Sequence, residues 1–165
     1  SYLFKGTVEE NLKMAKPDAT KEEMEAVLQK VNLLGFLQTQ DGLQTQLLEK
    51  ASNLSGGQCQ RLVIARALLR TDSAVYIFDE AASNIDVESE ELIMNVIHEL
   101  AKTKTVLLIS HRLANVVKSD KIYFLKDGEI KESGKHDELM SQNGAYRHLY
   151  ESQMALENYG KGGMA

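Results

Sequence analysis

The stretch "ASNLSGGQCQRLVIARALL", residues Ala51 to Leu69, places Ser-Gly-Gly directly before a run of apolar residues at helical spacing. Two adjacent glycines remove side-chain bulk and expose backbone N–H groups, and the start of a helix adds a partial positive charge. This combination is typical of a site that binds an anion, most often a phosphate. Phosphate sites usually also include a lysine-bearing loop, G-x-x-x-x-G-K-[ST], and the sequence contains none.

The composition fits an ordinary soluble globular protein. Of the 165 residues, 43% are hydrophobic and 26% are charged. The net charge of -5 argues against binding driven by bulk positive charge, and we expect no nucleic-acid partner. The single cysteine, Cys59, excludes an internal disulfide framework. No run of 18 apolar residues and no signal peptide occurs, so we expect the chain itself to be soluble.

Alternating helix and strand signals predict an α/β fold. Two short continuous apolar runs, Ala74 to Phe78 and Thr105 to Ile109, have the pattern of strands buried on both faces. The residues between them have helical spacing, which predicts a βαβ unit and hence a parallel sheet covered by helices.

The flanking segments carry local signals of their own. Thr20 and Glu23 form a capping box, which predicts the start of a helix, and we expect Gly35 to end it. A further helix is predicted from Gln58 to about Arg70.

After the second strand, the pattern changes to a hairpin and helices. Asp127-Gly128 lies between two strand-like runs, a strong hairpin signal. Residues from His136 to about Glu157 predict one or two helices broken near Asn143-Gly144, and residues 158–165 are expected to form a disordered tail.

Polar residues follow both predicted strands, at the edge where ligands bind in open α/β sheets. Asp79 and Glu80 can divide two tasks: one carboxylate can hold Mg²⁺, directly or through water, and the other can deprotonate an attacking water. The alternative is that they only begin the next helix, where acidic residues are favourable. His111 can bond a terminal phosphate or a catalytic water, although a histidine here is more often a surface residue.

These residues together resemble the motifs of the ATP-binding cassette (ABC) proteins. "LSGGQ", Leu54 to Gln58, is similar to the signature motif, and Asp79 and Glu80 resemble the end of the Walker B strand and the glutamate beside it. "SNID", Ser83 to Asp86, resembles the D-loop, and His111 matches the switch histidine. Two further stretches, "LFKGTVEENL" from Leu3 and "KDGEIKESGKHDEL" from Lys126, are similar to exporter-type cassettes.

The resemblance implies a role for each matching residue. The γ-phosphate of an ATP held by the opposite subunit would contact Ser55, Gly56, Gly57 and Gln58. Glu80 would be the general base, Asp79 would lie on the Mg²⁺ side, directly or through water, and His111 would contact the γ-phosphate and position the attacking water. Ser83 and Asp86, in the D-loop, would lie across the dimer interface.

The implied fold is a truncated P-loop NTPase (ABC ATPase) fold. Residues 1–72 would form the helical signature subdomain, and residues 73–157 the C-terminal part of the core, with a parallel sheet, flanking helices and a hairpin. Because the Walker A loop and the Q-loop glutamine are missing, we expect the C-terminal part of a cassette. Without the Walker A strand, the strand Thr105 to Ile109 should have an unpaired apolar edge.

The resemblance implies a transport ATPase that uses ATP and Mg²⁺ at the cytoplasmic face of the cell membrane, with this chain inactive alone. Its partners would be a second ABC nucleotide-binding domain, in a homodimer or a heterodimer, and the transmembrane domains of the transporter. One alternative is a soluble ABC ATPase of DNA maintenance or translation, although the large insertion usual before the signature is absent. Another is an interaction module that pairs with a cassette lacking this part.

Overall fold

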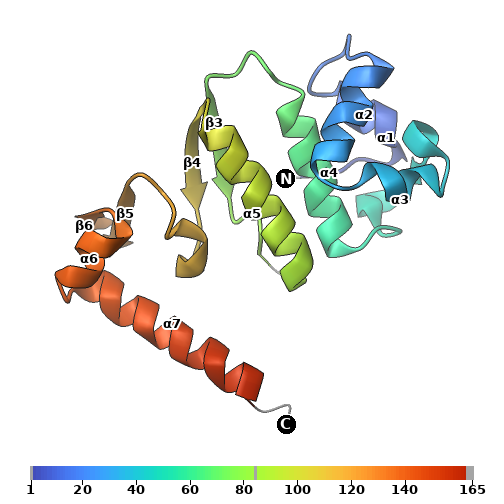
Figure 1. Ribbon diagram of the computed structural model, residues 1–165. Coiled ribbons are helices and arrows are strands. Elements are labelled where there is room, and N and C mark those ends of the chain that lie inside the picture. Colours follow the sequence, from blue (N-terminus) through green and yellow to red (C-terminus); the bar gives the residue numbers. More distant parts are fainter. Residues whose placement is uncertain (1, 84, 163–165) are drawn as a thin grey trace. The chain divides into compact units, whose positions relative to one another are not determined.

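In the computed structural model, which describes residues 2–83 and 85–162, the chain packs as two compact units, residues 1–107 and residues 108–165. Figure 1 labels their helices and strands. The division that we predicted between residues 72 and 73 does not coincide with this one, because helices on either side of it pack together within the first unit.

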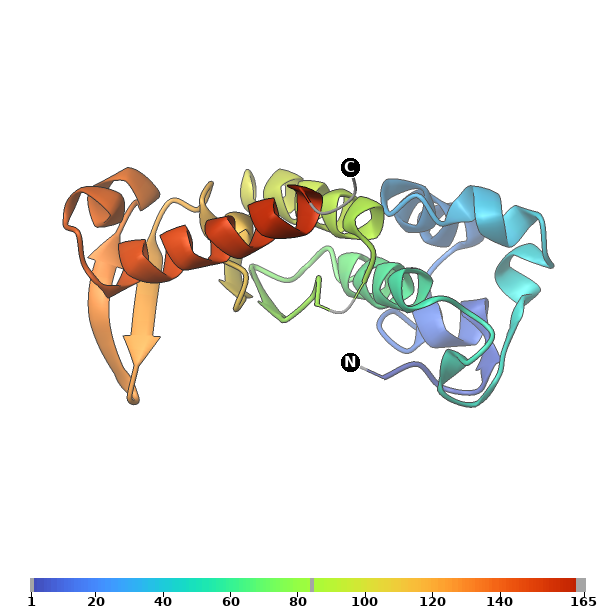
Figure 2. The same ribbon diagram turned by 90° about the horizontal axis from the view of Figure 1, so that it is seen from below.

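The first unit begins with a group of short helices, coloured from blue to green in Figure 2. In chain order its principal elements are β1 (Gly6–Thr7), α1 (Val8–Lys13), α2 (Lys21–Lys30), α3 (Leu34–Gln38), β2 (Gln46–Leu47), α4 (Gly56–Leu68), β3 (Val75–Asp79) and α5 (Val87–Ala101). Helix α4 contacts α1, α2 and α5. Leucines at the centre of this packing are fully buried, among them Leu12, Leu28 and Leu62.

Helix α2 starts where the sequence predicts but ends earlier. Thr20 caps it, and its hydroxyl accepts from the Glu23 amide (3.2 Å) while the Glu23 carboxylate accepts from the Thr20 amide (3.0 Å), which confirms the capping box. The expected end at Gly35 is wrong. Helix α2 stops at Lys30 because Asn32 takes a left-handed conformation (φ 51°), which asparagine tolerates, and Gly35 lies inside the next helix, α3.

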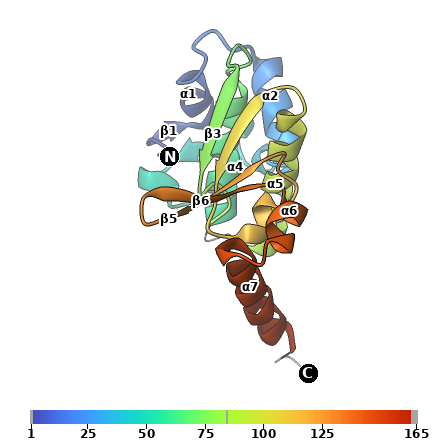
Figure 3. The same cartoon turned by 90° about the vertical axis from the view of Figure 1, so that its left-hand side faces the viewer.

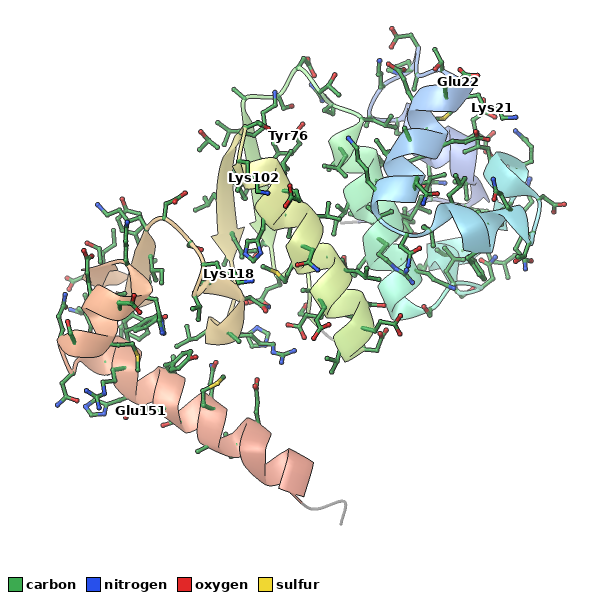
Figure 4. All side chains as sticks on the ribbon, viewed as in Figure 1. Lys21, Glu22, Tyr76, Lys102, Lys118 and Glu151 are labelled. Carbon is green, nitrogen blue, oxygen red and sulfur yellow. The ribbon has the colours of Figure 1, made fainter. Side chains whose placement is uncertain are left out.

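Strands β3 and β4 (Thr105–Ile109) form the predicted parallel pair, connected by α5. Figure 3 shows β3 with helices α4 and α5 on its far side. On that side Phe78 is buried, and the hydroxyl of the buried Tyr76, labelled in Figure 4, donates to the Arg70 carbonyl at 2.5 Å. Among the described residues β4 pairs only with β3, as the predicted unpaired edge requires.

The prediction that both strands are buried on both faces is wrong. Val75, Ile77 and Leu107 are exposed by 55%, 65% and 48% of their surface. Side chains alternate between the faces of a strand, and within the first unit helices cover only the face of Tyr76 and Phe78. The other face of this strand pair is apolar, and no described helix of the first unit covers it.

The second unit begins at Leu108, within β4, and is built around a hairpin. Its elements are the helical turn η3 (Leu113–Val116), β5 (Ile122–Lys126), β6 (Glu129–Gly134), α6 (His136–Ser141) and α7 (Ala145–Gly162). The hairpin is confirmed: Lys126 pairs with Glu129, and both turn residues, Asp127 (φ 53°) and Gly128 (φ 77°), have positive φ. A small core joins these elements, formed by Leu113, Val116, Ile122, Leu139 and Tyr146.

The helices at the end of the chain break where the sequence predicts. Asn143 is left-handed (φ 54°) and separates α6 from α7. The expected disordered tail from residue 158 is instead helical as far as Gly162, because α7 continues to that residue, and residues 163–165 lie outside the described part. No helix in the described part is both long and apolar enough to cross a bilayer.

The hairpin turn makes a first test of the fold. Gly128→Ala should lower the free energy of unfolding by about 1 kcal/mol, because alanine is disfavoured in the left-handed region. Urea denaturation followed by circular dichroism measures this change. Gly35→Ala is the matched control: a Cβ there has no neighbour within 4 Å, and alanine favours a helix, so stability should stay equal or rise. Equal effects at both positions would contradict the turn conformation.

Candidate signature and catalytic residues

The "LSGGQ" stretch forms the start of α4, and its first and last polar residues cap that helix. The Ser55 hydroxyl accepts from the Gln58 amide (3.2 Å), and the Gln58 side-chain carbonyl accepts from the Ser55 amide (2.8 Å). This reciprocal pair is a capping box. Our sequence reasoning treated both residues only as phosphate ligands, although the Ser-x-x-Gln spacing already indicated the cap.

The cap decides which donors an anion can reach. The Gln58 amide is taken by the Ser55 hydroxyl, and the Cys59 amide donates to the Ser55 carbonyl at 2.9 Å. The first amides of a helix have no partner within it, so those of Gly56 and Gly57 remain. Gly56 is exposed, as is Ser55, whereas Gly57 is buried. An anion can therefore approach the Gly56 amide and the Ser55 hydroxyl.

Gly57 has a packing role as well. A Cβ at this position would lie 2.8 Å from the Ser89 Cβ, closer than real side chains tolerate, and in a tight contact of 3.1 Å with the Asp86 Oδ2. The missing side chain thus lets the start of α4 lie against the start of α5. Asp86 caps α5, accepting from the Ser89 amide at 2.8 Å, and this hydrogen bond holds the pKa of the Asp86 carboxyl below its usual value.

The structure therefore brings the signature motif and the predicted D-loop of one chain together. Asp86 is exposed beside Gly57, and Asn84, in the middle of "SNID", lies outside the described residues. Neither the contact of Gly57 with Ser89 nor the capping role of Asp86 was found from the sequence. For Asp86 a signal was present, because aspartate before an amphipathic run is a common N-cap.

Asp79 and Glu80 differ in backbone conformation. Asp79 is the last residue of β3 and is exposed, whereas Glu80 is half-buried and left-handed (φ 52°). Glu80 therefore does not continue the extended backbone of β3. Positive φ in a residue other than glycine costs about 1 kcal/mol or more and occurs often at functional sites. Ser83 holds this turn, because its amide (3.1 Å) and its hydroxyl (2.9 Å) both donate to the Glu80 carbonyl.

The acidic residues fit a magnesium ion that arrives with a nucleotide. No cluster of three or more histidine, cysteine or acidic side chains suited to a metal occurs within the described ranges. Mg²⁺ is usually held by one or two carboxylates together with substrate phosphates and waters. Asp79, at the carboxyl end of β3, is an exposed carboxylate of the kind that such an ion requires.

His111 lies in the second unit, in the turn that follows β4. It is exposed, and its neighbours hold the turn: the Arg112 amide donates to the Ser110 hydroxyl at 3.0 Å. A residue that the sequence did not indicate also contacts this turn. Gln153, on α7, donates to the His111 carbonyl at 2.7 Å.

Known proteins share this fold and these motifs. The family model of the ABC transporters matches residues 1–83. An uncharacterized ABC transporter ATP-binding protein of Haemophilus influenzae is 53% identical over 157 residues, which are 95% of this chain and 28% of that protein. An ATP-dependent lipid A-core flippase of Mannheimia succiniciproducens is 44% identical over 154 residues, 92% of this chain and 26% of the flippase.

A solved structure agrees with these sequence relatives. The structure of a bacterial Atm1-family ABC exporter with ATP bound matches 93% of this chain and 27% of the exporter chain, with a TM-score of 0.85 and 30% identity. The match confirms that the chain has part of a P-loop ATPase fold of the ABC type. The chain belongs to the ABC transporter family, and it spans about a quarter of the length of the relatives named here.

The contact between α4 and α5 can be tested directly. Gly57→Ala should lower the free energy of unfolding by about 1–3 kcal/mol, because the new methyl group overpacks against Ser89. Urea denaturation of the chain measures this change.

A second substitution provides the control. Ser89→Gly removes the side chain that the new methyl group meets, so Gly57→Ala should cost much less in the Ser89→Gly background. An equal cost in both backgrounds would show that Gly57 is not required for this contact.

Proposed function

We propose that this chain contributes the signature motif and the hydrolytic residues to the nucleotide-binding domain of an ABC transporter, and that the parent protein couples ATP binding and hydrolysis to solute transport across a membrane. The observation that carries the proposal is the exposed, capped start of α4, with Ser55 and Gly56 accessible, in a chain that matches an ATP-bound exporter. The relatives include a flippase and an exporter, which favours transport over the soluble alternative.

In this proposal the residues from Ser55 to Gln58 bind the γ-phosphate of an ATP held by a second nucleotide-binding domain. The positive end of α4 and the free amide of Gly56 suit an anion. The sequence has no lysine-bearing phosphate loop, so the phosphate must be presented by other residues. The partner is a second copy of the same domain or a related one, and Ser83 and Asp86 lie at the interface with it.

Hydrolysis then depends on the residues that follow the two strands. Glu80 orients and deprotonates the attacking water, and its left-handed turn, held by Ser83, fixes the carboxylate relative to β3. Asp79 would hold Mg²⁺, directly or through water, and such an ion would supply positive charge beside the phosphates. His111 contacts the γ-phosphate and positions the water.

The bare face of β3 and β4 supports a role within a larger domain. Parallel strands are normally covered on both faces, and the exposed Val75, Ile77 and Leu107 lack such a cover in the first unit. Further parts of the parent nucleotide-binding domain cover this face. The assembled domain lies at the cytoplasmic side of the membrane and contacts the transmembrane domains.

The first functional test separates the chain from its parent. Isothermal titration calorimetry of this chain with ATP and Mg²⁺ should show no stoichiometric binding, because the lysine-bearing loop is absent. In the full-length parent, Glu80→Gln should lower kcat for ATP hydrolysis by about 100-fold or more while ATP still binds.

Glu88→Gln is the control for charge, because Glu88 is exposed in the first turn of α5, and it should leave kcat unchanged. Stoichiometric binding of ATP by this chain alone would show that residues outside it are not needed to hold the nucleotide. Full activity of Glu80→Gln would refute its role as the base.

A second test separates the capping role of the signature motif from its phosphate role. Gln58→Glu preserves the capping box, since glutamate also accepts from the Ser55 amide, so the free energy of unfolding should change by less than about 0.5 kcal/mol. The added negative charge should nevertheless weaken ATP-dependent association of the parent's nucleotide-binding domains, measured by sedimentation velocity.

Ser55→Ala is the matched comparison. It removes the hydroxyl that caps α4 and should cost about 1 kcal/mol of stability as well as weakening the association. If nucleotide-binding domains with Gln58→Glu associate at the same ATP concentration as the wild-type domains, residue 58 serves only the helix cap.

A further inference from the structure

We propose that Gln153, on α7, is a positioning residue that fixes the turn carrying His111. The proposal rests on the proposed role of His111 in hydrolysis. The Gln153 carboxamide makes two hydrogen bonds to backbone groups of that turn: its carbonyl oxygen accepts from the Leu113 amide (2.9 Å), and its nitrogen donates to the His111 carbonyl (2.7 Å).

This pair of bonds constrains the backbone on both sides of Arg112. A carboxamide is planar, so its donor and acceptor are held at a fixed separation, and together they fix the His111 carbonyl relative to the Leu113 amide. Inside the turn, the Arg112 amide donates to the Ser110 hydroxyl. The backbone that directs the His111 side chain is therefore held from within the turn by Ser110 and from outside by Gln153.

Helix α7 is itself anchored, which makes it a suitable support. Tyr146, near its start, is fully buried, and its hydroxyl shares a hydrogen bond of 2.8 Å with His136 Nδ1. The Glu132 carboxylate accepts from the Ala145 amide at the first residue of the helix. Leu113, which receives one of the two bonds, is buried in the same small core as Tyr146.

A second contact joins the same two segments. The Arg112 guanidinium pairs with the Glu157 carboxylate at 3.2 Å, one helical turn beyond Gln153. Both side chains are more than one third exposed, so this ion pair contributes little alone. It lies on the same side of α7 as Gln153, and the two contacts together show that this face of the helix is directed at the His111 turn.

The consequence is that α7 affects hydrolysis through His111 without touching the nucleotide. A displacement of the imidazole by a fraction of its own size lowers the rate, whereas the nucleotide remains bound by other residues. Loss of Gln153 should therefore lower kcat and leave KM for ATP almost unchanged. A purely structural role would lower stability without this separation.

Two variants separate the two hydrogen bonds. Gln153→Met has a similar length and removes both bonds, and Gln153→Glu keeps the acceptor for the Leu113 amide but removes the donor to the His111 carbonyl. Glu151→Gln is the matched control: Glu151, labelled on α7 in Figure 4, is half-exposed and pairs only with Arg147 among the described residues.

The experiment combines hydrogen exchange with kinetics. In this chain, the Leu113 amide should exchange about fivefold faster or more in Gln153→Met and at the wild-type rate in Gln153→Glu. In the full-length parent, both variants should lower kcat about tenfold or more and change KM by less than about threefold, with Glu151→Gln unchanged. If Gln153→Met does not fold, Gln153→Glu, which keeps the Leu113 bond, still provides the test.

A double variant identifies the route of the effect. If Gln153 acts through His111, Gln153→Met should cause no further loss of kcat in a His111→Ala background. Equal losses in both backgrounds, or full kcat in Gln153→Met, would overturn the proposal while leaving the proposed function intact. Wild-type kcat in His111→Ala alone would instead overturn the role of His111, and this proposal with it.

Discussion

The start of α4 can lie against the start of α5 only because residue 57 has no side chain. Ser89 fills the space that a Cβ would need, and Asp86 caps α5 beside it. The contact fixes the exposed end of α4, where Gly56 can meet an anion, relative to the loop that follows β3. One glycine of the signature motif thus serves packing while its neighbour remains accessible, although the two look equivalent in the sequence.

The loop that leads from β3 to α5 also contains a strained residue, Glu80. The chain leaves β3 through a left-handed residue, and Ser83 compensates with two hydrogen bonds to the Glu80 carbonyl. A carboxylate on this turn is directed differently from one on an extended strand. Ser83, which is expected to act across a dimer interface, therefore also shapes the turn that carries the proposed base, and Asp86, its expected companion there, caps α5.

Signals that act over a few residues were readable from the sequence, and contacts between distant residues were not. The Thr20–Glu23 capping box needs only its own turn of helix, so α2 starts where predicted. The end of α2 depends on Asn32 adopting a left-handed conformation, which the sequence permits but does not require. The packing of Gly57 and the bond from Gln153 to His111, 42 residues apart, have no local pattern. The motifs identified the family, but the contacts that hold the motif residues in place became visible only in the folded structure.

The bare sheet face and the missing phosphate loop have a common explanation. Along β3, Val75 and Ile77 are exposed and alternate with the buried Tyr76 and Phe78, although all four residues are apolar. A strand that is apolar on both faces is adapted to two layers of neighbours, and the first unit supplies only one. The proposed phosphate site likewise has no lysine-bearing loop in this chain. In the proposed function, both the cover of the sheet and the missing phosphate donors come from further parts of the nucleotide-binding domain.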